Sequence, residues 1–144
     1  MYHIIYSSRA KEAMTLTTLV VLLMQARALN EQHHITGALV YGDGQFMQVM
    51  EGEEAVLQAL YERIVQDPRH HDVRTLAEGP IARRSFAQWS MAFGEVPAAE
   101  FQVLQRVAAY QTPTQMANQL ATSQAADERL LTKMKELVHT HAKG

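Results

Sequence analysis

Polar side chains that interrupt apolar segments are the features of this chain most suited to binding a small molecule. Gln48 lies between Met47 and Val49 in an apolar run. A buried carboxamide without a hydrogen-bonding partner costs on the order of 1–3 kcal/mol. A polar group, from another side chain or from a bound ligand, must therefore lie over that run. Four more polar residues are predicted to point toward the same interior, namely Tyr6, Asn30, Arg63 and Asp67.

Each of these residues has a simple structural explanation when it is taken alone. Tyr6 could be a core tyrosine with its hydroxyl at the edge, and Asn30 could end a helix. Arg63 and Asp67 are four residues apart, so they could form an ion pair on a helix that contributes about 0.2–0.5 kcal/mol. Together with Gln48, however, the set would leave several donors unpaired in a closed core. A planar heterocycle rich in hydrogen-bond acceptors and N–H groups would satisfy them all.

The elements that must position these residues follow the order of a ferredoxin-like sandwich. Asp43-Gly44 separates two strand-forming runs and predicts a β-hairpin over residues 35–52. Thr15 is the predicted N-cap of the first helix, and Pro68 ends the second. The predicted fold is α+β, a β-α-β-β-α-β sandwich with an extra short strand and C-terminal helices. Its elements are expected at residues 2–8, 16–30, 35–52, 53–67, 71–78 and 91–96.

This topology makes the first and third strands neighbours at the centre of the sheet. Tyr6 and Gln48 then lie on adjacent strands, and both can face the same side because side chains alternate across a sheet. The apolar residues of the first helix recur at helical spacing. The stripe predicted to be buried is Leu16, Leu19, Val20 and Leu23.

The last third of the chain is predicted to be helical. Residues from 98 onward favour a helix that Pro113 interrupts, and residues 127–141 favour a second, amphipathic helix. We expect these helices to cover the sheet face that carries Met47 and Val49, or to join subunits in a homo-oligomer, at least a dimer. The predicted domains are 1–97 for the α+β unit and 98–144 for the helical extension. The stripe of the last helix is Leu130, Leu131, Met134, Leu137 and Val138.

The composition excludes several classes of function. The 144 residues include no cysteine, which excludes disulfides, thiolate metal sites and cysteine–flavin adducts. The net charge of −2, without a basic cluster, argues against nucleic-acid binding. The longest apolar run, residues 19–24, is too short to span a bilayer, and the N-terminus lacks the pattern of a secretion signal. We expect a soluble cytoplasmic protein. We also expect no metal site, because adjacent histidines such as His33-His34 and His70-His71 point to opposite faces when they lie in a strand.

The sequence resembles the BLUF family of blue-light sensors that use flavin. The matching segments occur in order and with family-like spacing between residues 2 and 96. They are IIYSS (4–8), ARALN (26–30), ITGALVYGDGQFMQVMEG (35–52), RIVQDPRHH (63–71) and RRSFAQWSM (83–91). The chain is most similar to short family members, which carry the sensor and a small helical tail.

The resemblance implies a role for each inward polar residue. Tyr6 would be the electron and proton donor to the excited flavin, and Gln48 would lie between Tyr6 and the flavin. Asn30 would hold the polar edge of the ring. Arg63 and Asp67 would contact the flavin from the second helix. These five residues are the predicted cofactor-binding set.

The resemblance also implies an output function. Trp89 and Met91 match residues whose placement is linked to signal output, so they would relay the change at Gln48 to the last strand. Leu29 departs from those family members that have a polar residue just before the asparagine, and one flavin hydrogen bond is expected to be absent. The implied protein is a photoreceptor and not an enzyme. It would bind FAD, with FMN as an alternative, and would signal to a separate partner protein.

Two other functions remain open at this point. A small enzyme on the same sandwich, such as an acyl phosphatase, could use arginine and asparagine to bind phosphate. Tyr6 and Gln48 on central strands argue against it, because a phosphatase does not need them. A BLUF-like domain that has lost its flavin could serve only in protein interaction, but the retention of all five inward polar residues argues against this.

Overall fold

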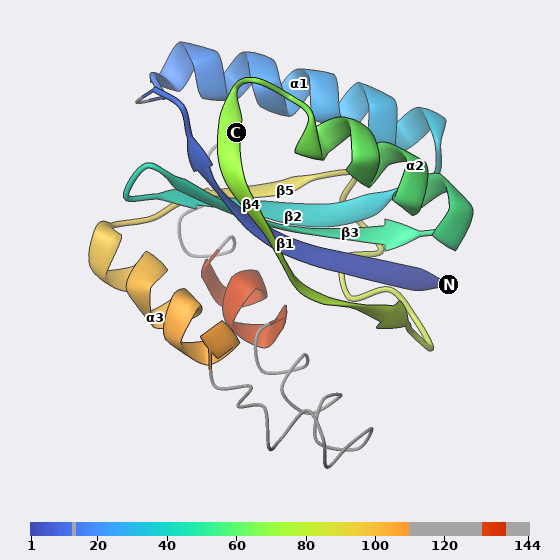
Figure 1. Ribbon diagram of the computed structural model, residues 1–144. Coiled ribbons are helices and arrows are strands. Elements are labelled where there is room, and N and C mark those ends of the chain that lie inside the picture. The colour runs from blue at the N-terminus through green and yellow to red at the C-terminus, as the bar shows by residue number, and fades with distance from the viewer. Residues whose placement is uncertain (13, 110–130, 138–144) are drawn as a thin grey trace.

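A five-stranded sheet with helices on both faces forms the core of the molecule (Figure 1). The computed structural model describes residues 1–12, 14–109 and 131–137. The strands are β1 (Tyr2–Ala10), β2 (Thr36–Gly42), β3 (Gln45–Gly52), β4 (His70–Pro80) and β5 (Ala92–Glu95). The helices are α1 (Leu16–Gln32), α2 (Glu54–Val65) and α3 (Ala98–Ala109), and residues 131–137 are also helical.

The strand order is β4-β1-β3-β2-β5, which confirms the predicted sandwich with an extra strand. All neighbouring strands are antiparallel except β2 and β5, which are parallel. The predicted pairing of the first and third strands is confirmed, and Tyr6 lies directly opposite Gln48. The hairpin that fixes this register turns at Asp43 and Gly44, whose φ angles of 54° and 67° suit a tight turn with two left-handed residues.

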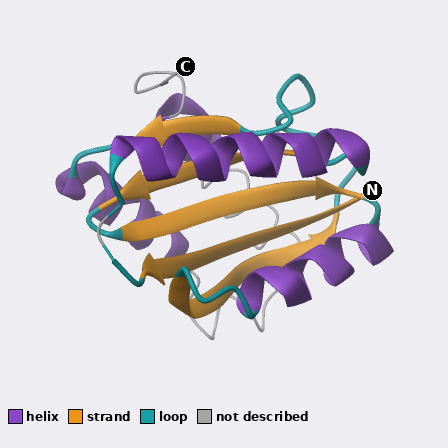
Figure 2. Ribbon diagram, turned by 90° about the horizontal axis from the view of Figure 1, so that it is seen from above, coloured by secondary structure: helices purple, strands orange, loops and turns teal. Residues whose placement is uncertain are grey.

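Helices α1 and α2 lie on one face of the sheet and are separated from each other, so that strands are visible between them (Figure 2). Thr15 caps α1 as predicted, because its side chain accepts a hydrogen bond from the Thr18 N–H at 3.1 Å. The predicted α1 stripe is only half correct. Leu19 and Leu23 are buried, but Leu16 and Val20 are 60% and 46% exposed. Successive helical residues are about 100° apart, so the turn that points Leu19 at the sheet points Val20 away from it.

The opposite sheet face is covered by the C-terminal part of the chain, as predicted. Met47 and Val49 share one core cluster with Phe101 of α3 and with Met134. Leu131, Met134 and Leu137 are all buried against the sheet. These members of the last helix's predicted stripe are therefore not available for joining subunits, and that route to an oligomer is wrong for them. Leu130, Val138 and Pro113 lie outside the described residues.

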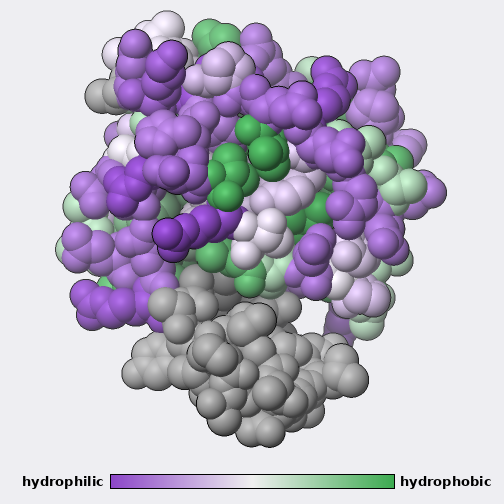
Figure 3. All heavy atoms as spheres, viewed as in Figure 1, coloured by the Kyte–Doolittle hydropathy of each residue, from purple (hydrophilic) through white to green (hydrophobic). Residues whose placement is uncertain are grey.

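The outer surface seen from the side of Figure 1 is mostly hydrophilic, with apolar side chains gathered near its middle (Figure 3). Among residues 1–12, 14–109 and 131–137, no helix combines the length and the apolar character needed to cross a membrane.

Candidate functional site

A cavity of about 270 Å³ lies between α1, α2 and the sheet. Most of its surface is apolar, although half of its lining residues carry a polar group. This is the usual composition of a site for a small organic ligand. The apolar lining residues are Leu22, Ala26, Leu29, Leu39, Phe46, Leu60 and Ile64. The lining residues with a polar group are Tyr6, Gln25, Asn30, Gln48, Asp67, Arg69 and His70.

A chain of hydrogen bonds crosses the sheet side of this cavity. The Tyr6 hydroxyl donates to Oε1 of Gln48, and Nε2 of Gln48 donates to the sulfur of Met91 at 3.7 Å. Burial raises the pKa of the Tyr6 phenol above its ordinary value, and Tyr61 and Asp67 add to the shift. Tyr6 therefore keeps its proton in the resting protein and is fixed as the donor. Gln48 uses its acceptor toward Tyr6 and its donor toward Met91.

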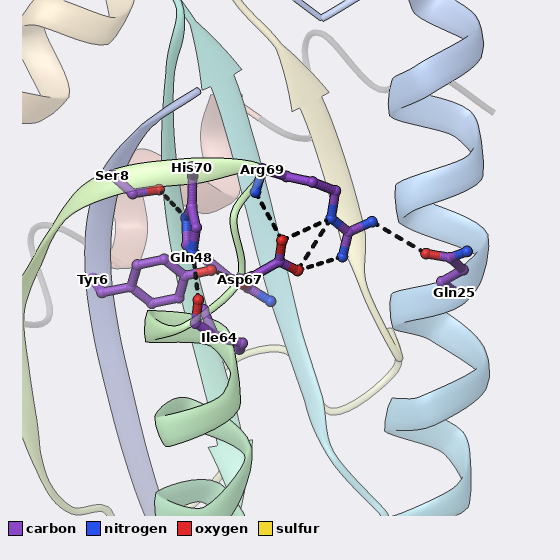
Figure 4. A network of polar contacts seen from close by, with 8 residues as sticks. All are labelled: Tyr6, Ser8, Gln25, Gln48, Ile64, Asp67, Arg69 and His70. Atoms are coloured by element: carbon purple, nitrogen blue, oxygen red, sulfur yellow. Dashed lines mark hydrogen bonds and ion pairs between the residues drawn. The ribbon is translucent and has the colours of Figure 1, made fainter. Parts of the chain in front are cut away.

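An ion pair between Asp67 and Arg69 lies on the α2 side of the cavity, just before β4 (Figure 4). The Asp67 carboxylate accepts hydrogen bonds from the Arg69 guanidinium at 2.6 Å and 3.0 Å and from the Arg69 backbone N–H at 2.9 Å. The side-chain hydrogen bond from Arg69 lowers the pKa of Asp67, against the opposing effect of burial. Arg69 also donates to Oε1 of Gln25 at 3.2 Å. This arginine therefore bridges the loop after α2 to helix α1.

His70 is held in one tautomer by its two neighbours (Figure 4). Its Nε2 lies 2.5 Å from the carbonyl oxygen of Ile64, which only accepts, so Nε2 carries the proton. Nδ1 then accepts from the Ser8 hydroxyl at 2.8 Å. The His70 ring lies edge-on to Tyr6, with 6.3 Å between ring centroids, and Tyr61 lies 5.4 Å from Tyr6 by the same measure. These two rings restrict the orientation of the Tyr6 phenol.

Four of the five predicted ligand-contacting residues line the cavity, but Arg63 does not. Arg63 is exposed and lines a second cavity of about 320 Å³, which shares Leu29 and Leu60 with the first. The prediction assumed that Arg63 and Asp67 share a helix face. Helix α2 ends at Val65, so Asp67 belongs to the following turn and pairs with Arg69 instead.

The sequence reasoning missed Arg69 and His70. Both follow Pro68, the residue predicted to stop the helix, and they bring the chain back to the edge of β1. The signal that could have found them is their position in the short connection between an inward-facing helix and an edge strand. Residues in such a connection lie over the end of the cavity that the helix covers.

Met91, rather than Trp89, faces Gln48. Met91 is 1% exposed and contacts Gln48 through its sulfur. Trp89 is half-buried and packs with Phe86 toward the opposite core, at a ring-centroid distance of 6.0 Å. Asn30 is buried at the C-terminal end of α1 and donates to the Ser90 carbonyl at 2.6 Å. The amide of Asn30 therefore connects the cavity lining to the segment that carries Met91.

The arrangement fits a flat ring system with apolar faces and polar edges. Leu29 and Leu60 are contributed by α1 and α2, one from each side, so apolar side chains are available for the faces of a ring. Asn30, Gln48 and the Asp67–Arg69 pair supply both donors and acceptors around the margin. This donor set fits a flavin, whose ring is planar and carries carbonyl and N–H groups on one edge. No strongly nucleophilic group is needed for such binding.

Comparison with known proteins gives the same class of site. Residues 1–92 match the family described as "BLUF: Sensors of blue-light using FAD". A photoactivated adenylate cyclase subunit beta from Euglena longa is 39% identical over 87 residues, which is 60% of this chain and 10% of the cyclase subunit. The chain thus spans about a tenth of the length of that relative.

Two solved structures share the fold over most of both chains. BlsA in its photo-activated state has a TM-score of 0.72 and 25% identity, with 99% of this chain and 98% of BlsA covered. BlrB, a BLUF protein in its dark state, has a TM-score of 0.64 and 26% identity, with 88% of this chain and 96% of BlrB covered. The fold and cavity define a small-ligand sensor domain. The chain belongs to the BLUF family of flavin-binding blue-light sensors.

Proposed function

We propose that this chain is an FAD-binding photoreceptor in which Tyr6 and Gln48 carry the photochemical response. The observation that carries the proposal is the hydrogen-bonded series Tyr6–Gln48–Met91 beside the cavity. The series joins an oxidisable phenol, a side chain with one donor and one acceptor, and a segment that leads toward the C-terminal helices.

The cavity residues have distinct binding roles in this proposal. Asn30 and Gln48 hold the polar edge of the ring, while Leu29 and Leu60 contact its faces. Arg69, together with Asp67, takes the role that the sequence assigned to Arg63. Its guanidinium reaches the cavity lining and carries the positive charge suited to the phosphate-bearing side of a flavin nucleotide.

When bound, a flavin supplies a ring that absorbs blue light and becomes a strong oxidant. The response of the protein then follows from its own groups. Tyr6 would give an electron to the excited ring, and its hydroxyl proton would move along the existing hydrogen bond to Oε1 of Gln48. Both would return to Tyr6 when the charges recombine, so there is no net oxidation. Gln48 then rearranges its hydrogen bonds, because its amide can present either a donor or an acceptor to each neighbour. Once its donor turns away from the Met91 sulfur, Met91 is released.

The signal leaves through the segment that ends in β5. Met91 immediately precedes β5, and β5 is followed by α3 after Pro97. Phe101 and Leu104 of α3 are fully buried in the core that contains Val96. We therefore take residues 1–97 as the sensor and residues 98–144 as the part that passes the signal on. This is a shift between two arrangements of one protein.

The output is proposed to act on a separate protein, and the chain itself is not proposed to be an enzyme. Its relatives include a photoactivated adenylate cyclase subunit and a blue light- and temperature-regulated antirepressor from Escherichia coli. The phosphatase alternative is less well supported, since Arg63 does not line the main cavity and phosphate chemistry gives no role to the buried Tyr6–Gln48 hydrogen bond. A homo-oligomer and a cytoplasmic location stay predictions from the sequence.

Flavin retention tests the binding part of this proposal. The protein is expected to purify yellow, and denaturation should release all of its flavin, which chromatography then identifies as FAD or FMN. Arg69→Ala should lower the flavin content, whereas Arg63→Ala, the matched control outside the cavity, should leave it unchanged. A colourless protein that cannot be reconstituted with either flavin would refute the sensor function. Equal losses in the two arginine variants would refute the assignment of Arg69.

A further inference from the structure

Glu51 is a fully buried carboxylate near the end of β3, outside the cavity. A buried charge is tolerated only when hydrogen bonds compensate for its lost hydration. Here each carboxylate oxygen meets a backbone N–H of two consecutive residues. Oε2 accepts from Ser85 at 2.5 Å, and Oε1 accepts from Phe86 at 2.9 Å. Oε1 also accepts from the Thr36 hydroxyl at 3.2 Å.

Arg84 also holds this segment to the strand ends, through hydrogen bonds from its own side chain. Its Nη1 donates to the carbonyl oxygen of Glu51 at 2.9 Å and to the Thr36 hydroxyl at 2.8 Å. Its Nη2 donates to the carbonyl oxygen of His34 at 2.8 Å. Residues 84–86 are therefore fixed to the start of β2 and the end of β3 by both side-chain and backbone groups.

The segment fixed in this way continues directly to the signalling residues. We call residues 84–91 the strap. Its far end is held by α1, because Asn30 donates to Ser90 and Arg27 donates to the Met91 carbonyl at 3.0 Å. Between the two ends, the N–H of Gly37 donates to the Trp89 carbonyl at 3.1 Å. The position of Met91 against Gln48 thus depends on a short segment that is held at both ends and, through Gly37, between them.

We propose that Glu51 is a positioning residue that holds the strap in place and thereby keeps the Met91 sulfur against Gln48. This inference rests on the proposed function in one respect, since it takes the Gln48–Met91 contact as the resting arrangement. The attachment at α1 uses groups that also line or adjoin the cavity, so a change at the ligand can alter it. The attachment at Glu51 is remote from the cavity. This attachment stays fixed while Met91 moves away from Gln48 and returns to it.

The arrangement of the two N–H donors requires a carboxylate, and not an amide, at position 51. Two adjacent N–H donors require two acceptor oxygens on one side chain. Glutamine keeps the shape of glutamate but replaces one oxygen with an NH₂ group, which faces an N–H without an acceptor between them. Glu51→Gln should therefore release one end of the strap without leaving a cavity. Glu51→Ala should release both N–H groups.

Hydrogen exchange in the flavin-free protein is the primary test. In Glu51→Gln, amide exchange across residues 84–91 should be faster by about fivefold or more, as expected when a hydrogen bond to a charged group is lost. Protection of β1 and β3 should stay at the wild-type level. Glu51→Ala should show a larger local increase. Glu62→Gln, a change at an exposed glutamate of α2, is the matched control and should change nothing in the strap.

Trp89 provides an independent readout, because it is the single tryptophan of the chain and lies in the strap. Quenching of its fluorescence by acrylamide should increase in Glu51→Gln relative to Glu62→Gln. In the flavin-loaded protein, Glu51→Gln should also change the rate at which the dark spectrum returns after illumination, with flavin content unchanged. A purely structural residue would alter stability without moving this rate at equal flavin content.

Three results would overturn the inference. These are unchanged strap protection in both Glu51 variants, an equal loss of protection throughout the domain, or faster strap exchange with a wild-type recovery rate. If Glu51→Ala does not fold, Glu51→Gln alone decides. If the wild-type protein shows no light response at all, the proposed function fails, whereas the exchange and quenching data in flavin-free protein still decide whether Glu51 holds the strap.

Discussion

The hydrogen bond between Tyr6 and Gln48 should appear as a coupling energy even when no flavin is bound. Tyr6→Phe keeps the ring and removes only the hydroxyl, and Gln48→Leu keeps most of the side-chain volume. Tyr6 and Gln48 are 4% and 8% exposed, so each single change leaves one buried polar group without its partner. Such a group costs about 1–3 kcal/mol. Because both residues line the cavity and water can reach them there, we expect the lower end, about 1 kcal/mol for each change.

The double variant should be less destabilised than the sum of the two single variants. It removes both polar groups, so neither is left unpaired, and the coupling should be about 1 kcal/mol. Urea unfolding of the wild type, the two single variants and the double variant, all without flavin, measures the cycle. Tyr61→Phe is the control partner, since the Tyr61 hydroxyl bonds Thr75 on the exposed side and should combine additively with Gln48→Leu. Additivity of Tyr6→Phe with Gln48→Leu, within about 0.3 kcal/mol, would refute the proposed pair.

Three further predictions follow from the same contacts. Asn30→Ala should mainly weaken flavin retention, measured as the flavin-to-protein ratio after gel filtration, because it removes a polar group from the cavity edge. The Arg69 hydrogen bond holds the pKa of Asp67 below the ordinary value for an aspartate, so the stability contributed by Asp67 is complete above the ordinary pKa and is lost as the pH falls through the lowered pKa. Asp67→Asn should flatten this acid limb of the urea-unfolding midpoint plotted against pH. Light should increase hydrogen exchange in residues 98–109 and 131–137 more than in β1 and β3, because segments held by one face open at lower free energy; equal exchange in light and dark would place the output elsewhere.

The central pair could be predicted from the sequence because turn chemistry, strand alternation and the chain order of the elements together place it. The Asp43-Gly44 turn sets the register of the hairpin, and strand alternation then decides which face Gln48 occupies. Tyr6 followed once the chain order indicated that the first and third strands are neighbours. These are properties of period and turn chemistry, which a single sequence contains.

Part of the margin of the site, at Arg69 and His70, could not be predicted in the same way. Helical spacing from Arg63 to Asp67 failed because α2 ends between them, and helix ends depend on packing as well as on Pro68. Arg69 lies in a connection without any period, so no pattern gave its direction. Glu51 shares its strand with Gln48, but its partners are backbone N–H groups more than thirty residues away. Backbone donors of a distant loop leave no mark in the sequence that would reveal them.

The light-minus-dark absorption spectrum tests the central claim most directly. Wild-type protein, Tyr6→Phe and Gln48→Ala are brought to equal flavin content and illuminated with blue light, and each spectrum is followed until it returns to its dark form. We predict a small reversible red shift of the flavin band in the wild type and its loss in both variants, with the flavin still bound. A normal, reversible red shift in either variant would contradict the assignment of Tyr6 and Gln48 as the photochemical pair.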